Sequence, residues 1–115
     1  EARGLLKETL VICLGEFGRA PTVALEKRFA GNSPGRKHWA SAYSILLAGG
    51  GTAPGQVIGR TDRLGGHPLT TPYSPCDVAA TIFAALGIDP AGHFLDEGNR
   101  PYRISEGLPI SALYG

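Results

Sequence analysis

Two short apolar runs, each stopped by glycine, constrain the fold of this chain more than any other feature of its sequence. The first covers residues 9–14 and ends at Gly15, and the second covers residues 43–48 and ends at three glycines, residues 49–51. Runs that stay apolar, instead of alternating with polar residues, predict strands covered on both faces, as in a parallel sheet. Residues 56–59 indicate a third, shorter strand.

A helix is expected over residues 75–86. Ser74 suits the N-cap, Pro75 suits the first helical position, and Asp77 complements the helix dipole. Apolar residues follow at helical spacing, and Gly87 fits a left-handed helix end. An apolar stripe on one side of this helix indicates that it covers a sheet.

Strands and a helix in this order predict an α/β fold, a partial doubly wound and mostly parallel sheet with helical cover. Two or three strands are too few for a complete doubly wound domain, so residues 1–115 are expected to be a single fragment of a larger one. Residues 1–7 are expected to end a helix, residues 91–107 to be mostly loop, and Cys13 to be buried in the first strand. Strands with bare edges predict that the fragment self-associates.

Composition limits the classes of function. The chain has 17 Gly and 9 Pro among 115 residues, which predicts many tight loops. Its formal net charge of +1 argues against a nucleic-acid or membrane-surface binder that relies on bulk charge. No apolar run approaches the roughly 18 residues of a membrane span, and two cysteines do not form a disulfide framework. Chemistry is therefore expected in the glycine-rich loops.

The loop after the first strand carries Glu16 and Arg19 among glycines. In open α/β sheets, ligands gather at the carboxyl ends of the strands. A carboxylate there can coordinate a metal ion or act as a base, and Arg19 offers a planar fork for phosphate, sulfate or carboxylate. The alternative is an ion pair between Glu16 and Arg19 that only holds the loop.

A second loop places Arg36, Lys37 and His38 directly before Trp39. Its cations can receive an anion, and His38 can bind a metal ion or carry a proton. The alternative is a surface loop in which Trp39 folds onto the core and His38 bonds to the backbone.

A third polar loop covers residues 59–68 and contains Asp62 and His67. Both are metal-ligand types, but their spacing matches no standard metal motif. A solvated loop held by an Arg–Asp pair is the simpler interpretation.

Four segments in this order resemble the C-terminal part of a large bacterial family, the sulfatase-like domain-of-unknown-function family 1501. The segments are residues 15–21, 35–39, 44–51 and 74–90. The resemblance covers nearly the whole chain, and residues 104–110 also resemble the tail of that family. The family is considered a relative of the alkaline phosphatase and sulfatase superfamily. The resemblance implies that the chain is the C-terminal portion of an alkaline-phosphatase-like fold, with metals at the strand ends.

In those hydrolases a metal-binding Asp-His pair follows a strand of this kind, and a further His lies in a later loop. The resemblance places Glu16 at the first of these positions and His38 at the later one. Phe17 stands at the second position, where it cannot bind metal, so one metal or an altered site is implied. Zn, Ca, Mg or Mn is the implied metal, with Glu16 and His38 as ligands. Arg19 and Arg36 would hold the anionic oxygens of a small ester substrate.

Two functions follow as hypotheses. The first is a metal-dependent hydrolase of phosphate or sulfate esters, whose nucleophile lies in a preceding part of the protein, so that this fragment alone is expected to be inactive. The second is a catalytically inactive, sulfatase-like binding or structural domain, which Phe17 favours. The family commonly carries a twin-arginine export signal, which implies an exported or periplasmic protein.

Overall fold

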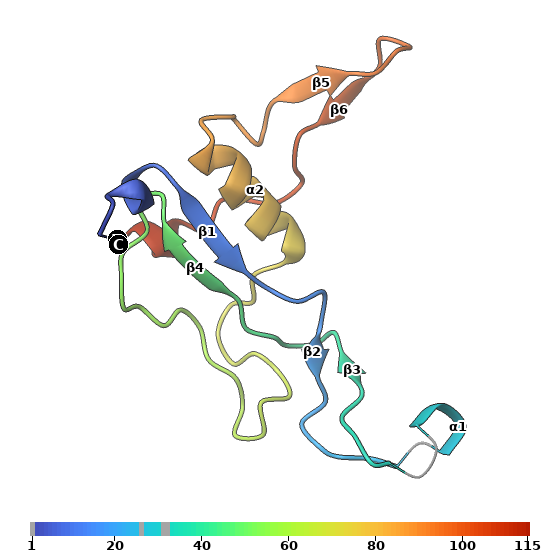
Figure 1. Cartoon of the computed structure of the whole chain (residues 1–115). Coiled ribbons are helices and arrows are strands. Elements are labelled where there is room, and N and C mark those ends of the chain that lie inside the picture. Colours follow the sequence, from blue (N-terminus) through green and yellow to red (C-terminus); the bar gives the residue numbers. More distant parts are fainter. Residues whose placement is uncertain (1, 26, 31–32) are drawn as a thin grey trace. The chain divides into compact units, whose positions relative to one another are not determined.

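The computed structural model describes residues 2–25, 27–30 and 33–115, and the chain divides into two compact units. The first, here called the helix unit, comprises Glu1–Val11, Leu47–Ile58 and Tyr73–Gly115. The second, here called the loop unit, comprises Ile12–Leu46 and Gly59–Pro72. Figure 1 labels the elements along the chain.

The main helix of the helix unit is α2, Pro75–Ala85, and the sequence prediction for it is confirmed. The Ser74 hydroxyl accepts from the Asp77 N–H at 3.2 Å, and Asp77 Oδ2 accepts from the Ser74 N–H at 2.7 Å. This reciprocal pair satisfies two backbone donors that the first turn of a helix leaves without a partner. Gly87, with a φ of 76°, takes the expected left-handed conformation just after the helix.

The chain near its C-terminus runs back along α2 over residues 105–110, and we call this packed arrangement the tail clasp. The Ser105 hydroxyl donates to the Cys76 carbonyl at 3.1 Å, and the Leu108 N–H donates to Asp77 Oδ1 at 2.8 Å. Asp77 therefore uses one carboxylate oxygen to cap the helix and the other to hold the tail.

The tail clasp also contains the buried centre of the helix unit. Ala80 and Thr81 are fully buried, and Ile110 is 4% exposed. The Ile110 N–H donates to the Thr81 hydroxyl at 2.9 Å, and that hydroxyl donates to the Asp77 carbonyl at 2.7 Å. Because the hydroxyl both accepts and donates, the buried amide of Ile110 keeps a hydrogen-bond partner.

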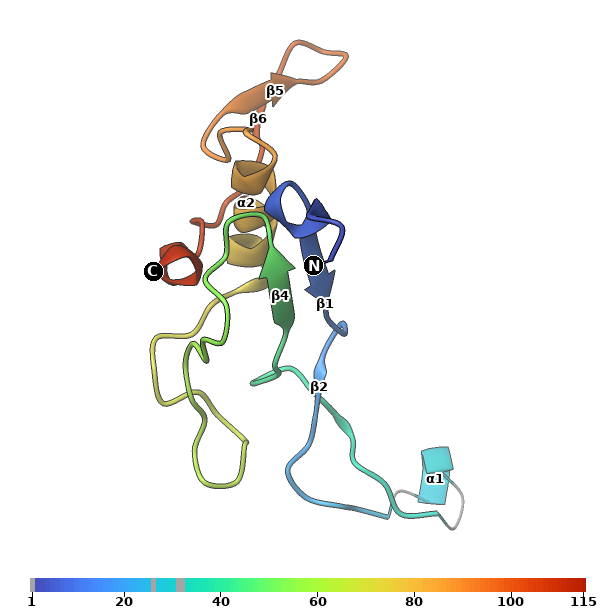
Figure 2. The ribbon, with the colours of Figure 1, turned by 60° about the vertical axis from the view of Figure 1, so that its left-hand side comes forward.

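The predicted parallel, doubly wound sheet is wrong, because the described residues form three separate two-stranded sheets. One of them pairs β1, Leu10–Cys13, with β4, Leu46–Gly49. A Cβ atom on Gly49 would collide with the Thr9 carbonyl, so the end of β4 lies beside the start of β1. The two strands are therefore antiparallel, and their arrows run in opposite directions in Figures 1 and 2.

The apolar sequence of β1 misled the fold prediction for a physical reason. Exposure alternates along this strand: Leu10 and Ile12 are half-buried, whereas Val11 and Cys13 are exposed. The expectation that Cys13 is buried is therefore wrong. An unbroken apolar run cannot by itself distinguish a strand covered on both faces from one with a solvent-facing side.

A hairpin occupies part of the region predicted to be mostly loop, which corrects that prediction. It pairs β5, His93–Leu95, with β6, Pro101–Arg103, in antiparallel register. Asp96 Oδ1 accepts from the N–H groups of Gly98 and Arg100, and Asn99 adopts a positive φ of 58°. An Asp, Gly and Asn cluster between two short runs is a turn signal that the sequence analysis missed.

The remaining predictions of secondary structure have mixed outcomes. A short 3-10 helix, η1 (Leu5–Lys7), stands where the end of a helix was expected, and a second one, η2, covers Ser111–Tyr114. Residues 56–59, expected to be a strand, have no regular structure. In the part of the chain that the structure describes, no helix has the length and apolarity needed to cross a membrane.

The loop unit is organised by a long hairpin over residues 17–39, which we call the basic hairpin. It pairs β2, Gly18–Arg19, with β3, His38–Trp39, in antiparallel register. A second bridge joins Ala24 to Gly35, and α1, Lys27–Ala30, lies in the loop beyond that bridge. This hairpin carries most of the residues that the sequence analysis selected.

Candidate functional site

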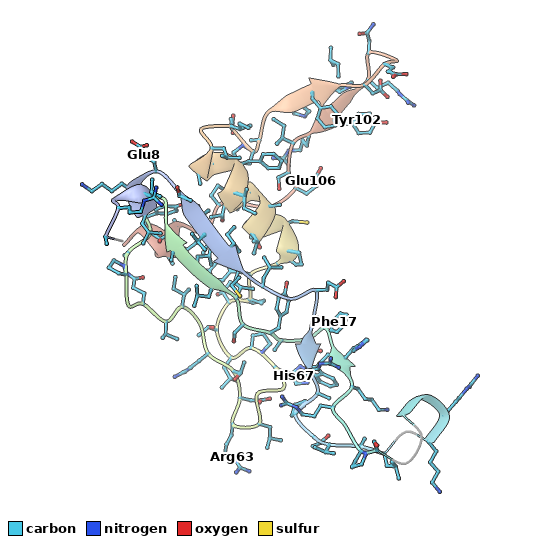
Figure 3. All side chains as sticks on the ribbon, in the orientation of Figure 1. Glu8, Phe17, Arg63, His67, Tyr102 and Glu106 are labelled. Atoms are coloured by element: carbon cyan, nitrogen blue, oxygen red, sulfur yellow. The ribbon has the colours of Figure 1, made fainter. Side chains whose placement is uncertain are left out.

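One face of the basic hairpin brings together two predicted site residues. Arg19 and His38 are direct cross-strand partners, so their side chains lie on the same face. The ring of Phe17 stacks on that of His38 with 3.9 Å between centroids, and the Arg19 guanidinium carbon lies 6.0 Å from the Phe17 centroid. Figure 3 shows Phe17 beside β2 and β3. Arg19 and His38 are both exposed, so this face can receive an anion from solvent.

The guanidinium of Arg19 is anchored to the segment that leads into β3. Its Nη1 donates to the carbonyl oxygen of Arg36 at 3.2 Å. Among the described residues, no ion pair joins Arg19 to Glu16, so the alternative of a purely structural pair within this loop does not hold. Arg19 has four further N–H donors, and these can bind an incoming oxyanion.

A neighbouring glycine is required by close packing. A Cβ atom on Gly18 would collide with the Ala42 carbonyl and would lie 3.0 Å from Tyr43 Cβ. Any other residue at this position would therefore push β2 away from residues 42–43. Gly18 thus fixes the backbone from which Arg19 projects.

Trp39 lies on the other face of β3 and packs against the third polar loop. Its indole N–H donates to the Gly66 carbonyl at 2.7 Å, and the His67 ring meets it edge-on with 5.7 Å between centroids. His67 is labelled in Figure 3. Trp39 is half-buried there, so this contact fixes how β3 and the loop of residues 59–68 pack together.

The carboxylate of Asp62 organises that loop. It accepts from the N–H groups of Gly66, Leu64 and His67 at 2.8, 3.1 and 3.2 Å. These bonds hold the pKa of the Asp62 carboxyl below its ordinary value, and the bond from the Gly66 N–H has the largest effect. Backbone amides, rather than the expected Arg–Asp pair, therefore stabilise the loop.

The metal prediction rests on Glu16 and His38, which are a carboxylate and an imidazole on exposed parts of the loop unit. These donor types suit the metals implied by the sequence resemblance. Within residues 2–25, 27–30 and 33–115, however, no group of three or more His, Cys, Asp or Glu could hold a metal ion. Catalytic zinc sites commonly use three protein ligands. Glu16 and His38 can therefore form only part of such a site.

Phe17 has a role that the sequence analysis did not anticipate. The sequence resemblance places it at a metal-ligand position, whereas its ring stacks on that of His38. Phe17 lies in a bend directly before β2, so its place beside His38 follows only from the register of β2 and β3.

Comparison with known proteins places the chain in a family without assigning a reaction. The family described as "Protein of unknown function (DUF1501)" matches residues 1–114. No curated protein and no solved structure matches the chain. The relationship to alkaline phosphatases and sulfatases that the sequence resemblance implies stays a prediction. Because the family match extends over nearly the whole chain, the protein belongs to the DUF1501 family.

Proposed function

We propose that this chain supplies ligand and anion-binding residues to a metal-dependent hydrolase of phosphate or sulfate esters. The observation that carries the proposal is the shared face of Arg19 and His38 on β2 and β3. Arg19 presents a planar fork of donors, which matches the oxygens of a phosphate or sulfate group. Arg36, in the segment that leads into β3, is the second proposed anion-binding residue.

Glu16 and His38 are the proposed metal ligands. Carboxylates suit Mg, Ca and Mn, whereas imidazole suits Zn, so the donor set is compatible with each of these ions. A bound ion would act as a Lewis acid on the ester oxygen. The stack on Phe17 covers a face of the His38 ring, whereas the nitrogens that bind metals lie on the ring edge.

The rest of the catalytic site is proposed to come from a preceding part of the same protein. The described residues hold no group of three metal donors, so at least one ligand must be added. The nucleophile would lie in that part as well. In this proposal the chain binds and orients the ester but does not cleave it alone.

Metal binding by the chain tests the ligand assignment. We expect titration calorimetry with ZnCl₂ and MnCl₂ to give saturable heat, and Glu16→Gln and His38→Ala to weaken binding at least about 10-fold each. His93→Ala is the matched control, because His93 is an exposed histidine of β5 in the helix unit. Equal losses for His38→Ala and His93→Ala, or no saturable heat at all, would overturn the assignment.

Hydrolysis tests the reaction. In the protein with its preceding residues present, we expect cleavage of an aryl phosphate or an aryl sulfate that depends on added metal. Arg19→Lys should raise KM, since a lysine cannot form the paired contact that a guanidinium makes with an oxyanion. Cleavage that Glu16→Gln, His38→Ala and Arg19→Lys all leave unchanged would place the reaction elsewhere in the protein.

A second candidate function is a binding or structural domain without catalysis. Phe17 favours it, because this residue stands where the resemblance places a metal ligand and instead stacks on His38. This alternative predicts that inorganic sulfate binds in an Arg19-dependent manner and that ZnCl₂ and MnCl₂ do not bind. The same titrations therefore separate the two functions.

A further inference from the structure

The charged residues of the chain are unevenly distributed, although its net charge is close to zero. The basic hairpin, residues 17–39, contains five of the eleven Lys and Arg residues but one of the ten Asp and Glu residues, so its net charge is +4. The rest of the chain contains six basic and nine acidic residues, a net charge of −3. The overall value of +1 therefore says little about what the hairpin attracts, since local fields steer charged ligands.

The cations lie along the hairpin rather than at one end. Arg19 and Arg36 lie on the side of the Ala24–Gly35 bridge nearer to β2 and β3, whereas Lys27 begins α1 beyond that bridge. All three residues are exposed. A small ester can contact one end of such a hairpin, whereas a linear chain with repeated anionic groups can contact both.

We infer that the basic hairpin is a docking surface for a polysaccharide that carries anionic ester groups. The inference deepens the proposed function, on which it rests, because it makes the substrate a polymer. One ester group of the polymer would sit between Arg19 and His38, and groups further along would pair with Arg36 and Lys27. Each cation of the hairpin that pairs with the polymer releases a counterion from it, so the affinity is expected to fall steeply as the salt concentration rises.

The aromatic side chains favour a polysaccharide over a single-stranded nucleic acid. Proteins that bind single strands without sequence preference stack bases on open aromatic rings. Here the Phe17 ring is stacked on His38, and the Trp39 ring is bonded to Gly66 and meets His67. Both of the rings described here therefore already contact a histidine ring, which favours recognition through the cations.

Fluorescence anisotropy with labelled dextran sulfate tests the inference on the full chain. We expect binding at 50 mM salt that weakens at least about 10-fold at 200 mM, and no binding of unsulfated dextran. Lys27→Glu should weaken binding about 5-fold, because it changes the hairpin from +4 to +2. Lys7→Glu is the matched control, since Lys7 is an exposed lysine of η1 outside the hairpin, and it should change binding less than 2-fold.

Three results would overturn the inference. Dextran sulfate could fail to bind, or Lys27→Glu and Lys7→Glu could weaken binding equally, which would move the contact away from the hairpin. An oligothymidylate of equal charge could bind more tightly than dextran sulfate, which would favour nucleic acid. Circular dichroism of each variant, and the Lys27→Ala variant, guard against a folding defect. Metal titrations report on Glu16 and His38 instead, so failure of docking and failure of the proposed hydrolase function remain distinguishable.

Discussion

The tail clasp and the basic hairpin use their polar groups in opposite ways. In the tail clasp, the side chains of Asp77 and Thr81 accept from backbone amides of residues 105–110, around a fully buried centre. In the basic hairpin, backbone groups pair with each other at a few positions, and charged side chains face solvent. Donors and acceptors that are already used within the fold are not available to a ligand, whereas Arg19 keeps four of its five N–H donors. The first region is therefore expected to set stability and the second to carry chemistry.

The largest loss of stability is expected from adding a side chain at Gly107 in the tail clasp. A Cβ atom there would collide with the Cys76 carbonyl group and with the Asp77 nitrogen. Because those atoms are helix backbone, they cannot move aside, and Gly107→Ala should destabilise α2 by about 3 kcal/mol. Urea unfolding followed by circular dichroism at the helix band measures the loss.

Gly35→Ala is the matched control in the basic hairpin. A Cβ atom at Gly35 meets nothing within 4 Å, so this change should lower stability by less than about 0.5 kcal/mol. If the two alanine variants unfolded at the same urea concentration, the contrast between the two regions would be lost.

A smaller loss is expected when the buried hydroxyl of the tail clasp is removed. Thr81→Val keeps the shape of the side chain but leaves the buried Ile110 N–H without its acceptor, which should cost about 2 kcal/mol. Thr81→Ser keeps the hydroxyl and separates its effect from that of the methyl group. Thermal unfolding should rank wild type first, Thr81→Ser second and Thr81→Val last, and an unchanged Tm for Thr81→Val would show that the bond adds no stability.

A pH-dependent loss of about 1 kcal/mol is expected from Asp77. The N–H of Leu108, followed by the N–H and hydroxyl of Ser74, holds the pKa of the Asp77 carboxyl below its ordinary value of 3.8. Folding therefore favours the charged form, so this contribution is complete above pH 3.8 and is lost as the pH falls through and below that value. Tm measured from about pH 6 to about pH 2 should show wild type approaching Asp77→Asn at the acid end.

The comparison with Asp77→Asn isolates one carboxylate from the others. The pKa of Asp62 and that of Asp96 are also lowered, by backbone N–H groups of Gly66 and of Arg100 respectively. Both groups titrate in wild type and variant alike, so the difference between the two curves belongs to Asp77. A gap that stays constant across this pH range would contradict the assignment.

Local signals predicted the elements of the fold better than their assembly. Ser74, Pro75 and Gly87 act within a few residues of themselves, so α2 was predicted nearly to its bounds. The direction of β1 against β4 depends on how 32 intervening residues fold, which no local pattern reports. Those residues form a returning hairpin rather than the crossover that parallel strands need.

The candidate site was partly predicted for a related reason. Chain position after the first strand selected Glu16 and Arg19, and residue type selected His38. Their register depends on two short strands, β2 and β3, that have no apolar pattern of their own, so the pairing of Arg19 with His38 was not foreseen. The stack of Phe17 on His38 follows from that register and was missed with it.

The smallest effect on stability is expected from changing the Phe17 ring of the basic hairpin. Phe17→Leu removes the stack on His38, but the imidazole is exposed, so stability should fall by about 0.5 kcal/mol or less. Urea unfolding followed by the fluorescence of Trp39, the single tryptophan, measures it within the loop unit. Tyr102→Leu is the matched control, because Tyr102 stacks on Phe94 at 5.8 Å within the β5–β6 hairpin.

The two ring variants should differ in binding rather than in stability. Phe17→Leu frees the His38 ring to move, so it should weaken binding of inorganic sulfate or dextran sulfate about 3-fold, whereas Tyr102→Leu should leave both unchanged. A loss of more than 2 kcal/mol in Phe17→Leu, with sulfate binding unchanged, would make the stack a structural support like the tail clasp. Arg19 would then have to bind an anion without an oriented imidazole beside it.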